Sequence, residues 1–174
     1  EKELLARHGG PTPEALVESA AKSLRTCEKA RFHNLKFSLK ASDVVATIEA
    51  YRLFSRRYDY PLHIGVTEAG TVFSGTVKSA VGLGVLLSEG IGDTLRVSLT
   101  GSPEEEVRVG WRILRGLGLR RRGGALGSGP TCGRVSIDVV GIAQEVERRL
   151  SRLAAPLKVA VMGCAVNGPG EARE

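Results

Sequence analysis

Residues 35–40, LKFSLK, predict a β-strand, and LHIGVT at 62–67 and LRVSL at 95–99 predict two further strands. Short apolar runs and apolar–polar alternation of this length are typical of strands with a buried face. The onsets near residues 35, 62 and 94 give strand–helix units of about thirty residues, the size of a βαβ crossover. The sequence therefore predicts an α/β fold with a parallel sheet.

The stretches between these strands predict helices. Ser42 and Asp43 can cap a helix that continues through Phe54, because their side chains accept hydrogen bonds from the first turn. A second helix is expected from about residue 74 to 87, and Gly90 ends it. Both helices follow a strand directly, as the βαβ pattern requires.

A third helix begins in Ser102-Pro103-Glu104-Glu105. Ser102 can cap it, Pro103 suits the first helical position, and Glu105 can complete a capping box. Its predicted apolar face consists of Val107, Trp111 and Leu114.

Two more helices flank this central region. The first starts at residues 12–14, TPE, and carries Cys27 on its apolar stripe, so we expect Cys27 to be a core residue and not a ligand. The second covers residues 139–153 and ends before Pro156. Its predicted apolar face consists of Val139, Ile142, Val146, Leu150 and Leu153.

A short strand at residues 157–161, LKVAV, leads to Cys164. The break at residues 154–156, AAP, is the expected boundary between two domains. On this prediction residues 1–153 belong to the first domain, and residues 154–174 begin the second.

The composition is that of a globular chain, and it argues against a membrane or nucleic-acid partner. Hydrophobic residues make up 42% of the 174 residues, enough for a core, and the net charge is +6. No apolar run approaches the ~20 residues of a membrane span, and no signal peptide is visible.

Three cysteines without paired spacing argue against a disulfide framework, so we expect a cytoplasmic protein. Arg120-Arg121-Arg122 is interpreted as a solvated loop, and without interleaved aromatics we expect no nucleic-acid partner.

Polar residues collect at the ends of the three strands. Lys40 closes the first and Glu68 follows the second, while Arg96 and Ser98 share one face of the third. Parallel α/β proteins place their sites at this edge, so Lys40, Arg96 and Ser98 can bind an anion and Glu68 can move a proton. An Arg96–Glu68 ion pair is the alternative. His63, inside a strand, is interpreted as a core histidine.

Two cysteines lie in turns rich in Gly and Pro. Cys132 is in GPTCGR, residues 129–134, while Cys164 and Glu171 are in MGCAVNGPGE, residues 162–171. Such turns let the backbone approach a metal or an iron–sulfur centre closely. Two buried cysteines in tight turns are the alternative, and the spacing alone leaves both open.

These motifs resemble those of the 4-hydroxy-3-methylbut-2-enyl diphosphate synthase family, the iron–sulfur enzymes of the methylerythritol phosphate route to isoprenoids. The resemblance runs in order along nearly the whole chain. It is carried by GPTPEALVESA at 10–20, SLKASD at 38–43, GVTEAG at 65–70, GIGDTLRVSLT at 90–100 and VMGCAVNGPGEA at 161–172.

The resemblance implies the C-terminal part of a (β/α)8 TIM barrel, followed by the start of a smaller α/β domain with a [4Fe-4S] cluster. Three cysteines and one glutamate hold the cluster in the family. Cys132, Cys164 and Glu171 match two of those cysteines and the glutamate. The residues matching Lys40, Glu68, Arg96 and Ser98 line the pocket for the cyclic diphosphate.

The implied reaction is a two-electron reductive ring opening with loss of water. Asn167 matches a residue that can approach the substrate when the enzyme closes. The family works as a homodimer, in which the cluster domain of one subunit covers the barrel of the other. Reduced flavodoxin or ferredoxin supplies the electrons.

Two features depart from the family pattern. Gly129 replaces the first cysteine of a Cys-Pro-x-Cys motif, so one thiolate of the cluster is missing. A non-catalytic or cluster-deficient relative that keeps the anion pocket is therefore the alternative function. The length is the second departure, because a closed barrel needs roughly 250 residues. We expect the chain to be an internal fragment of a longer protein.

Overall fold

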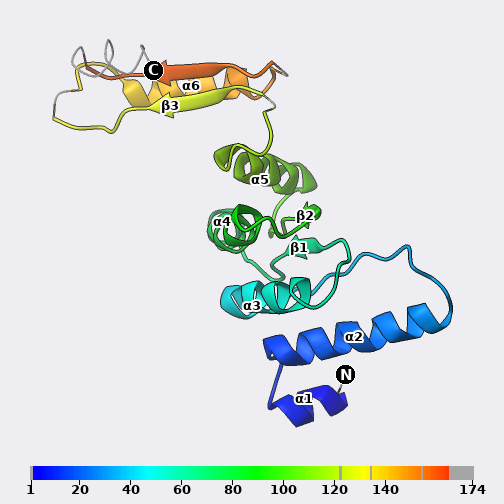
Figure 1. Cartoon of the computed structure of the whole chain (residues 1–174). Helices are drawn as coiled ribbons and strands as arrows, with labels where there is room; N and C mark the ends of the chain where they lie inside the picture. Colours follow the sequence, from blue (N-terminus) through cyan, green and yellow to red (C-terminus); the bar gives the residue numbers. More distant parts are fainter. Residues whose placement is uncertain (1, 122, 134, 154, 165–174) are drawn as a thin grey trace. The chain divides into compact units, whose positions relative to one another are not determined.

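The computed structural model describes residues 2–121, 123–133, 135–153 and 155–164 (Figure 1). Their contacts divide the chain into two compact units, Glu1–Leu119 and Arg120–Glu174. The first unit contains α1 (Lys2–His8), α2 (Pro13–Lys29), α3 (Val44–Ser55), β1 (His63–Gly65), α4 (Val72–Ser88), β2 (Thr94–Arg96) and α5 (Pro103–Gly116). The second contains β3 (Ala125–Ser128), α6 (Val139–Leu150) and β4 (Lys158–Val161).

Parallel strands form the sheet of the first unit, as the sequence predicts. β1 and β2 pair in parallel with His63 opposite Thr94. A parallel bridge between Phe37 and Leu62 joins the segment 35–40 to β1. The three predicted strands therefore lie side by side, although their regular parts are shorter than predicted.

A tyrosine hydroxyl interrupts the pairing between the segment 35–40 and β1. The Leu39 N–H donates to the Tyr51 hydroxyl over 3.0 Å, and that hydroxyl donates to the His63 carbonyl over 2.7 Å. In an uninterrupted parallel ladder the Leu39 N–H would donate directly to that carbonyl. Since the hydroxyl takes this place, only Phe37 of the predicted strand forms a bridge.

One side of the sheet is apolar and packs against α3 and α4. Ile64, Leu83 and Leu86 are completely buried there. Burying each such side chain contributes about 1.5–3 kcal/mol to stability. α4 approaches the sheet closely at Gly82, where a Cβ atom would lie 2.9 Å from Val66 Cγ2. Tyr51 and Phe54 of α3 complete this core with Leu39, Leu62 and Val97.

The predicted helix caps are present. Asp43 Oδ1 accepts from the Ala46 N–H over 2.7 Å, and Ser102 Oγ accepts from the Glu105 N–H over 3.4 Å. The Glu105 carboxylate pairs with Arg108 in the next turn. The Ser102 half of the predicted capping box is therefore formed, while the Glu105 side chain has a different partner.

The buried face of α5 differs from the predicted one. Val109 and Ile113 are buried, whereas Val107 is 61% exposed. Trp111 and Leu114 are half-buried and line a groove of about 270 Å³ beside β2. Among the described residues, no helix is both long and apolar enough to cross a membrane.

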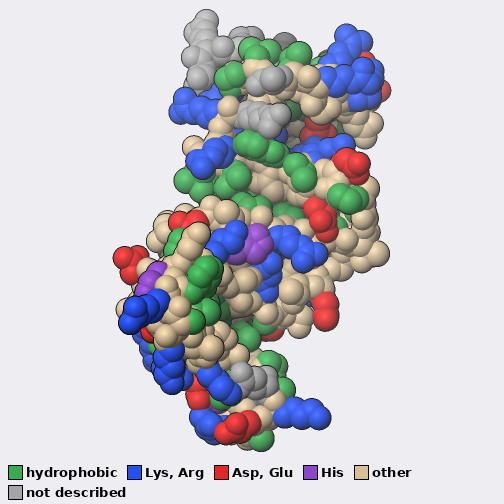
Figure 2. Space-filling view, turned by 90° about the vertical axis from the view of Figure 1, so that its right-hand side faces the viewer, with side chains coloured by type: hydrophobic (Ala, Val, Ile, Leu, Met, Phe, Trp, Pro, Cys, Tyr) green, Lys and Arg blue, Asp and Glu red, His purple; other side chains and the backbone are tan. Residues whose placement is uncertain are grey.

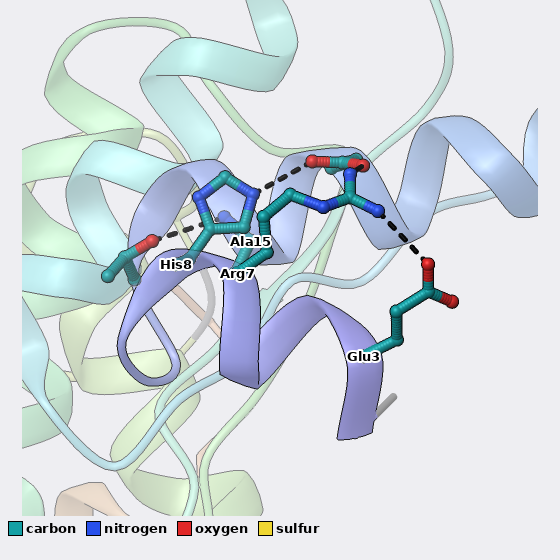
Figure 3. A network of polar contacts seen from close by, with 6 residues as sticks. Glu3, Arg7, His8 and Ala15 are labelled. Atoms are coloured by element: carbon teal, nitrogen blue, oxygen red, sulfur yellow. Dashed lines mark hydrogen bonds and ion pairs between the residues drawn. The ribbon is translucent and has the colours of Figure 1, made fainter.

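A polar network holds α1 against α2 (Figure 3). His8 Nε2 lies 2.8 Å from Glu18 Oε2, and Arg7 binds Glu18 and, over 3.2 Å, Glu3. α2 begins as predicted, since Thr12 Oγ1 accepts from the Ala15 N–H over 3.2 Å. Cys27, near the end of α2, is half-buried and not fully in the core.

The second unit is built on the parallel pair β3 and β4, in which Ser128 lies opposite Val161. β4 is the predicted strand, but β3 is not predicted by the sequence. Because β3 pairs with β4 and α6 packs on both, the contacts divide the chain before β3, not at residues 154–156. α6 ends at Leu150, which is buried together with Val139, whereas Ile142 and Leu153 are exposed.

Candidate functional site

The polar side of the sheet in the first unit carries two rows of side chains. Side chains alternate across a strand, so every second residue of the three segments points to this side. Figure 2 shows a face on which Lys and Arg side chains gather around a histidine. By the strand pairing, the first row is Ser38, His63 and Thr94, and the second row is Lys40, Gly65 and Arg96.

Lys40 lies across Gly65. A Cβ atom at Gly65 would be 3.2 Å from Lys40 Cε and 2.7 Å from the Arg96 carbonyl oxygen. Burial lowers the pKa of Lys40, and the charges of Arg96 and Lys36 lower it further. The half-buried ammonium group thus lies among other cations, which is a favourable environment for an anion.

Arg96 is exposed and Ser98, two residues later, is half-buried. Arg96 makes no ion pair with Glu68 in this structure, so the alternative arrangement considered from the sequence is not formed. The nearby carboxylate of Glu106 accepts from the Leu99 N–H over 2.8 Å. The Arg96 guanidinium therefore keeps its five donors available on the polar side of the sheet.

Glu68 has an unusual backbone conformation. Its φ angle is 51°, in the left-handed region, and its side chain is exposed at the end of β1. A non-glycine residue in this region is uncommon and costs conformational energy, and such residues cluster at functional sites. The backbone holds Glu68 in the turn that links β1 to α4.

The polar side contains two residues that the sequence analysis did not select, Lys36 and Thr94. His63, predicted to be a core histidine, lies in their midst and is only half-buried. Its Nδ1 lies 2.8 Å from Thr94 Oγ1, so the ring is hydrogen-bonded on the polar face and not within the apolar core. Strand alternation from Lys40 and Arg96 could have identified Lys36 and Thr94, whereas the place of His63 follows from the pairing of β1 with β2.

In the second unit, the turns that contain the two cysteines follow adjacent strands. The Gly129 N–H donates to the Val161 carbonyl over 3.1 Å, and the Ser136 N–H donates to the Gly163 carbonyl over 3.1 Å. These bonds join the turn after β3 to the turn after β4. Cys132 is exposed and Cys164 is half-buried.

The residues of these turns match part of a soft-metal site. Two thiolates in adjoining turns are the donor type that iron–sulfur centres use. Within the described ranges, no three His, Cys, Asp or Glu side chains form a group that could hold a metal ion. Glu171, the predicted further ligand, and Asn167, the predicted substrate contact, lie outside the described residues.

Gly129 stands where the family resemblance of the sequence led us to expect a thiolate. A Cβ atom at this position would lie 3.3 Å from Met162 Sδ, so a side chain there needs a shift of a few tenths of an ångström. The thioether of methionine is flexible and can give way. A cavity of about 290 Å³ lies beside this position and is lined by Gly129, Ser128, Thr131 and residues of α6.

Two family models match the chain in the same order as its two units. The GcpE TIM-barrel domain matches residues 1–111, and the GcpE protein C-terminal domain matches residues 125–174. The chain belongs to the GcpE family. The TIM-barrel match agrees with the parallel sheet and helices of the first unit, and the match to the GcpE C-terminal domain begins at the first residue of β3.

Curated GcpE relatives are similar along the whole chain. A protein of Geobacter sulfurreducens is 64% identical over 174 residues, and one of Caldanaerobacter subterraneus subsp. tengcongensis is 63% identical over 174 residues. Both are named 4-hydroxy-3-methylbut-2-en-1-yl diphosphate synthase (flavodoxin). These alignments cover 100% of this chain and 49% of each relative, so the chain spans about half the length of the relatives it matches.

Proposed function

We propose that this chain is part of a 4-hydroxy-3-methylbut-2-enyl diphosphate synthase and that its polar sheet face binds 2-C-methyl-D-erythritol 2,4-cyclodiphosphate. The observation that carries the proposal is the row of Lys40, Gly65 and Arg96. It brings two cations together, and neither has a carboxylate partner among the described residues. Family membership and the names of the relatives support the choice of reaction.

The chemistry follows from the difference between substrate and product. The C–O bond between C2 and the ring phosphate breaks, the C3 hydroxyl leaves, and a C2=C3 double bond forms. Both oxygens leave with their electron pairs, so two electrons must enter, and the departing hydroxyl takes up a proton to become water. The diphosphate stays attached at its other end.

The residues of the polar face have distinct roles in this scheme. Lys40 and Arg96 hold the diphosphate through charge-assisted hydrogen bonds, which are stronger than neutral ones. Ser98 donates to a phosphate oxygen at the end of β2. Glu68 gives the proton that the departing hydroxyl needs, and Asn167 contacts the substrate when the enzyme closes.

Cys132, Cys164 and Glu171 would hold a [4Fe-4S] cluster in the domain that follows the barrel. When bound, this cluster supplies the two electrons of the reductive ring opening. Reduced flavodoxin or ferredoxin delivers electrons to the protein, which works as a homodimer in the cytoplasm. The barrel is a (β/α)8 barrel, of which this chain supplies the C-terminal strand–helix units.

The proposal is tested by assaying the full-length protein anaerobically with the cyclic diphosphate and a reductant. We expect formation of 4-hydroxy-3-methylbut-2-enyl diphosphate together with one equivalent of water. Arg96→Gln removes the charge that the β2 strand contributes to the second row and should lower kcat/KM by more than tenfold. Unchanged kinetics of Arg96→Gln would remove the polar face from the substrate site.

A cluster-deficient relative is the second candidate, and Gly129 is the residue that distinguishes it, although the names of the relatives favour the synthase. With a glycine at this position, two cysteines and one glutamate are available to four irons. Such a protein would bind the cyclic diphosphate but hold little iron and sulfide. Measuring iron and acid-labile sulfide in the purified full-length protein separates the two functions.

A further inference from the structure

His63 lies in the row next to Lys40 and Arg96, on the same side of the sheet. Its position is fixed at two points. The ring Nδ1 is hydrogen-bonded to Thr94 Oγ1 on β2. Its backbone carbonyl accepts hydrogen bonds from the Tyr51 hydroxyl of α3 and from the Ser38 hydroxyl, at 2.7 and 3.0 Å.

The charged groups around His63 are all cations. Burial lowers the pKa of His63, and the charges of Lys40, Lys36 and Arg96 lower it further. Tyr51 is the residue of α3 that binds the His63 carbonyl, and burial raises the pKa of its hydroxyl, which keeps it neutral. Glu49 and Arg52 of α3 are paired with each other. Asp93, at the edge of β2, binds the Leu62 N–H instead. These effects favour the neutral form of the imidazole while the anion site is empty.

A bound diphosphate would instead favour the protonated form of His63. Its negative charges favour the protonated form of a nearby imidazole, and they offset the repulsion from Lys40 and Arg96. Once the ring is protonated, both nitrogens are donors. Nδ1–H can then donate to Thr94, and Nε2–H can donate to a phosphate oxygen, since no described residue binds Nε2.

We propose that His63 is a further anion-binding residue of the polar face and that it takes up one proton from solvent when the diphosphate binds. This inference rests on the proposed function. It makes substrate affinity depend on pH through a residue that the sequence assigns to the core. Lys40 and Arg96 supply permanent charge, and His63 supplies charge only when the ligand is present.

Calorimetry on the full-length protein tests the proton uptake. The cyclic diphosphate is the suitable probe, because each phosphorus carries one ester and one anhydride linkage and therefore has no ionisation near neutral pH. Titrations at one pH in buffers with different heats of ionisation give the number of protons bound with the ligand. We expect net uptake by the wild-type protein, and a dissociation constant that rises by up to about tenfold per pH unit above the free-state pKa of His63.

His63→Gln keeps a side-chain hydrogen bond to Thr94 but cannot take up a proton. We expect this variant to bind without proton uptake and with a dissociation constant nearly independent of pH. His33→Gln is the matched control, because His33 is exposed in the loop before the first strand segment and should leave the uptake unchanged. Should His63→Gln fold poorly, the NMR titration of His63 in the wild-type protein, with and without ligand, replaces it.

The outcomes separate the two proposals. If the wild-type protein does not bind the cyclic diphosphate, the proposed function fails and this inference fails with it. If it binds without proton uptake, or if the NMR titration of His63 does not move to higher pH with ligand, only the inference is overturned. Uptake that survives in His63→Gln also overturns it, because the proton then goes to another group.

Discussion

The side chain of Lys40 passes over Gly65, so close that a Cβ atom at Gly65 would lie 3.2 Å from Lys40 Cε. The two residues come from neighbouring segments of one parallel sheet. The missing side chain at residue 65 leaves the space in which the lysine stem lies. The position of a charge at the proposed substrate site therefore depends on the absence of a side chain in the next strand.

Gly65→Ala should damage this arrangement. The added Cβ would be 2.7 Å from the Arg96 carbonyl oxygen, and that backbone atom cannot move without shifting β2. We expect a loss of stability of about 1–3 kcal/mol, the usual cost of overpacking, together with weaker binding of the cyclic diphosphate. Thermal unfolding and calorimetry on the full-length protein measure both effects.

Gly84→Ala is the matched control for that change. Gly84 lies in α4, and a Cβ atom there meets nothing within 4 Å. Replacing a helical glycine with alanine stabilises by roughly 0.5–1 kcal/mol, and substrate affinity should stay as in the wild type. A Gly65→Ala protein as stable and as tightly binding as Gly84→Ala would show that the sheet has more room than the structure indicates.

Glu68 offers a test that separates catalysis from folding. Glu68→Gln should bind the substrate nearly normally but turn over at least ~100-fold more slowly, because proton transfer by a side chain contributes ~10²–10⁴-fold. Glu68→Gly should be equally inactive and yet at least as stable as wild type, since glycine adopts a positive φ without the cost of roughly 1 kcal/mol.

Arg31→Gly is the control for the relief of backbone strain at a positive φ angle. Arg31 also has a positive φ, 56°, and lies just after α2. The Arg31→Gly protein should become slightly more stable without any change in turnover.

Turnover of Glu68→Gln within a few-fold of wild type, with affinity strongly reduced, would make Glu68 a binding residue only.

Gly129→Cys should change the metal content of the protein. After anaerobic reconstitution we expect the Gly129 protein to hold a substoichiometric, air-labile centre and the cysteine variant to hold a stable cluster with four irons per chain. Gly127→Cys adds a thiol within β3, where a Cβ atom meets nothing within 4 Å, and should not raise the iron content. Four irons per chain in an air-stable Gly129 protein would show that this position needs no thiolate.

Local signals in the sequence predicted those features that depend on neighbouring residues. Asp43 and Ser102 cap the predicted helices, because a cap needs only the next turn of the chain. The hydroxyl of Tyr51 between Leu39 and His63 could not be predicted, since those residues meet only after the helix packs on the sheet. β3, with the sequence ALGS, carries no strand pattern and exists because it pairs with β4.

The same distinction applies to the candidate site. Lys40 and Arg96 stand at strand ends, where the sequence alone favours an anion site, and the structure places them in one row. His63 was assigned to the core because it lies inside a strand, but the pairing register puts it on the polar face beside Thr94. The sequence shows which residues of one strand share a face. The pairing register between strands decides which residues of different strands become neighbours.

The central claim, that the row of Lys40 and Arg96 binds the cyclic diphosphate, is tested most directly by its dissociation constant in the full-length protein. Lys40→Ala and Arg96→Ala should each weaken binding by about 1.5–3 kcal/mol, the range for hydrogen bonds to charged groups, and added salt should reduce these differences. Lys78→Ala, at an exposed position on α4, should have no effect. A double variant, Lys40→Ala with Arg96→Ala, that binds as tightly as Lys78→Ala would contradict the account.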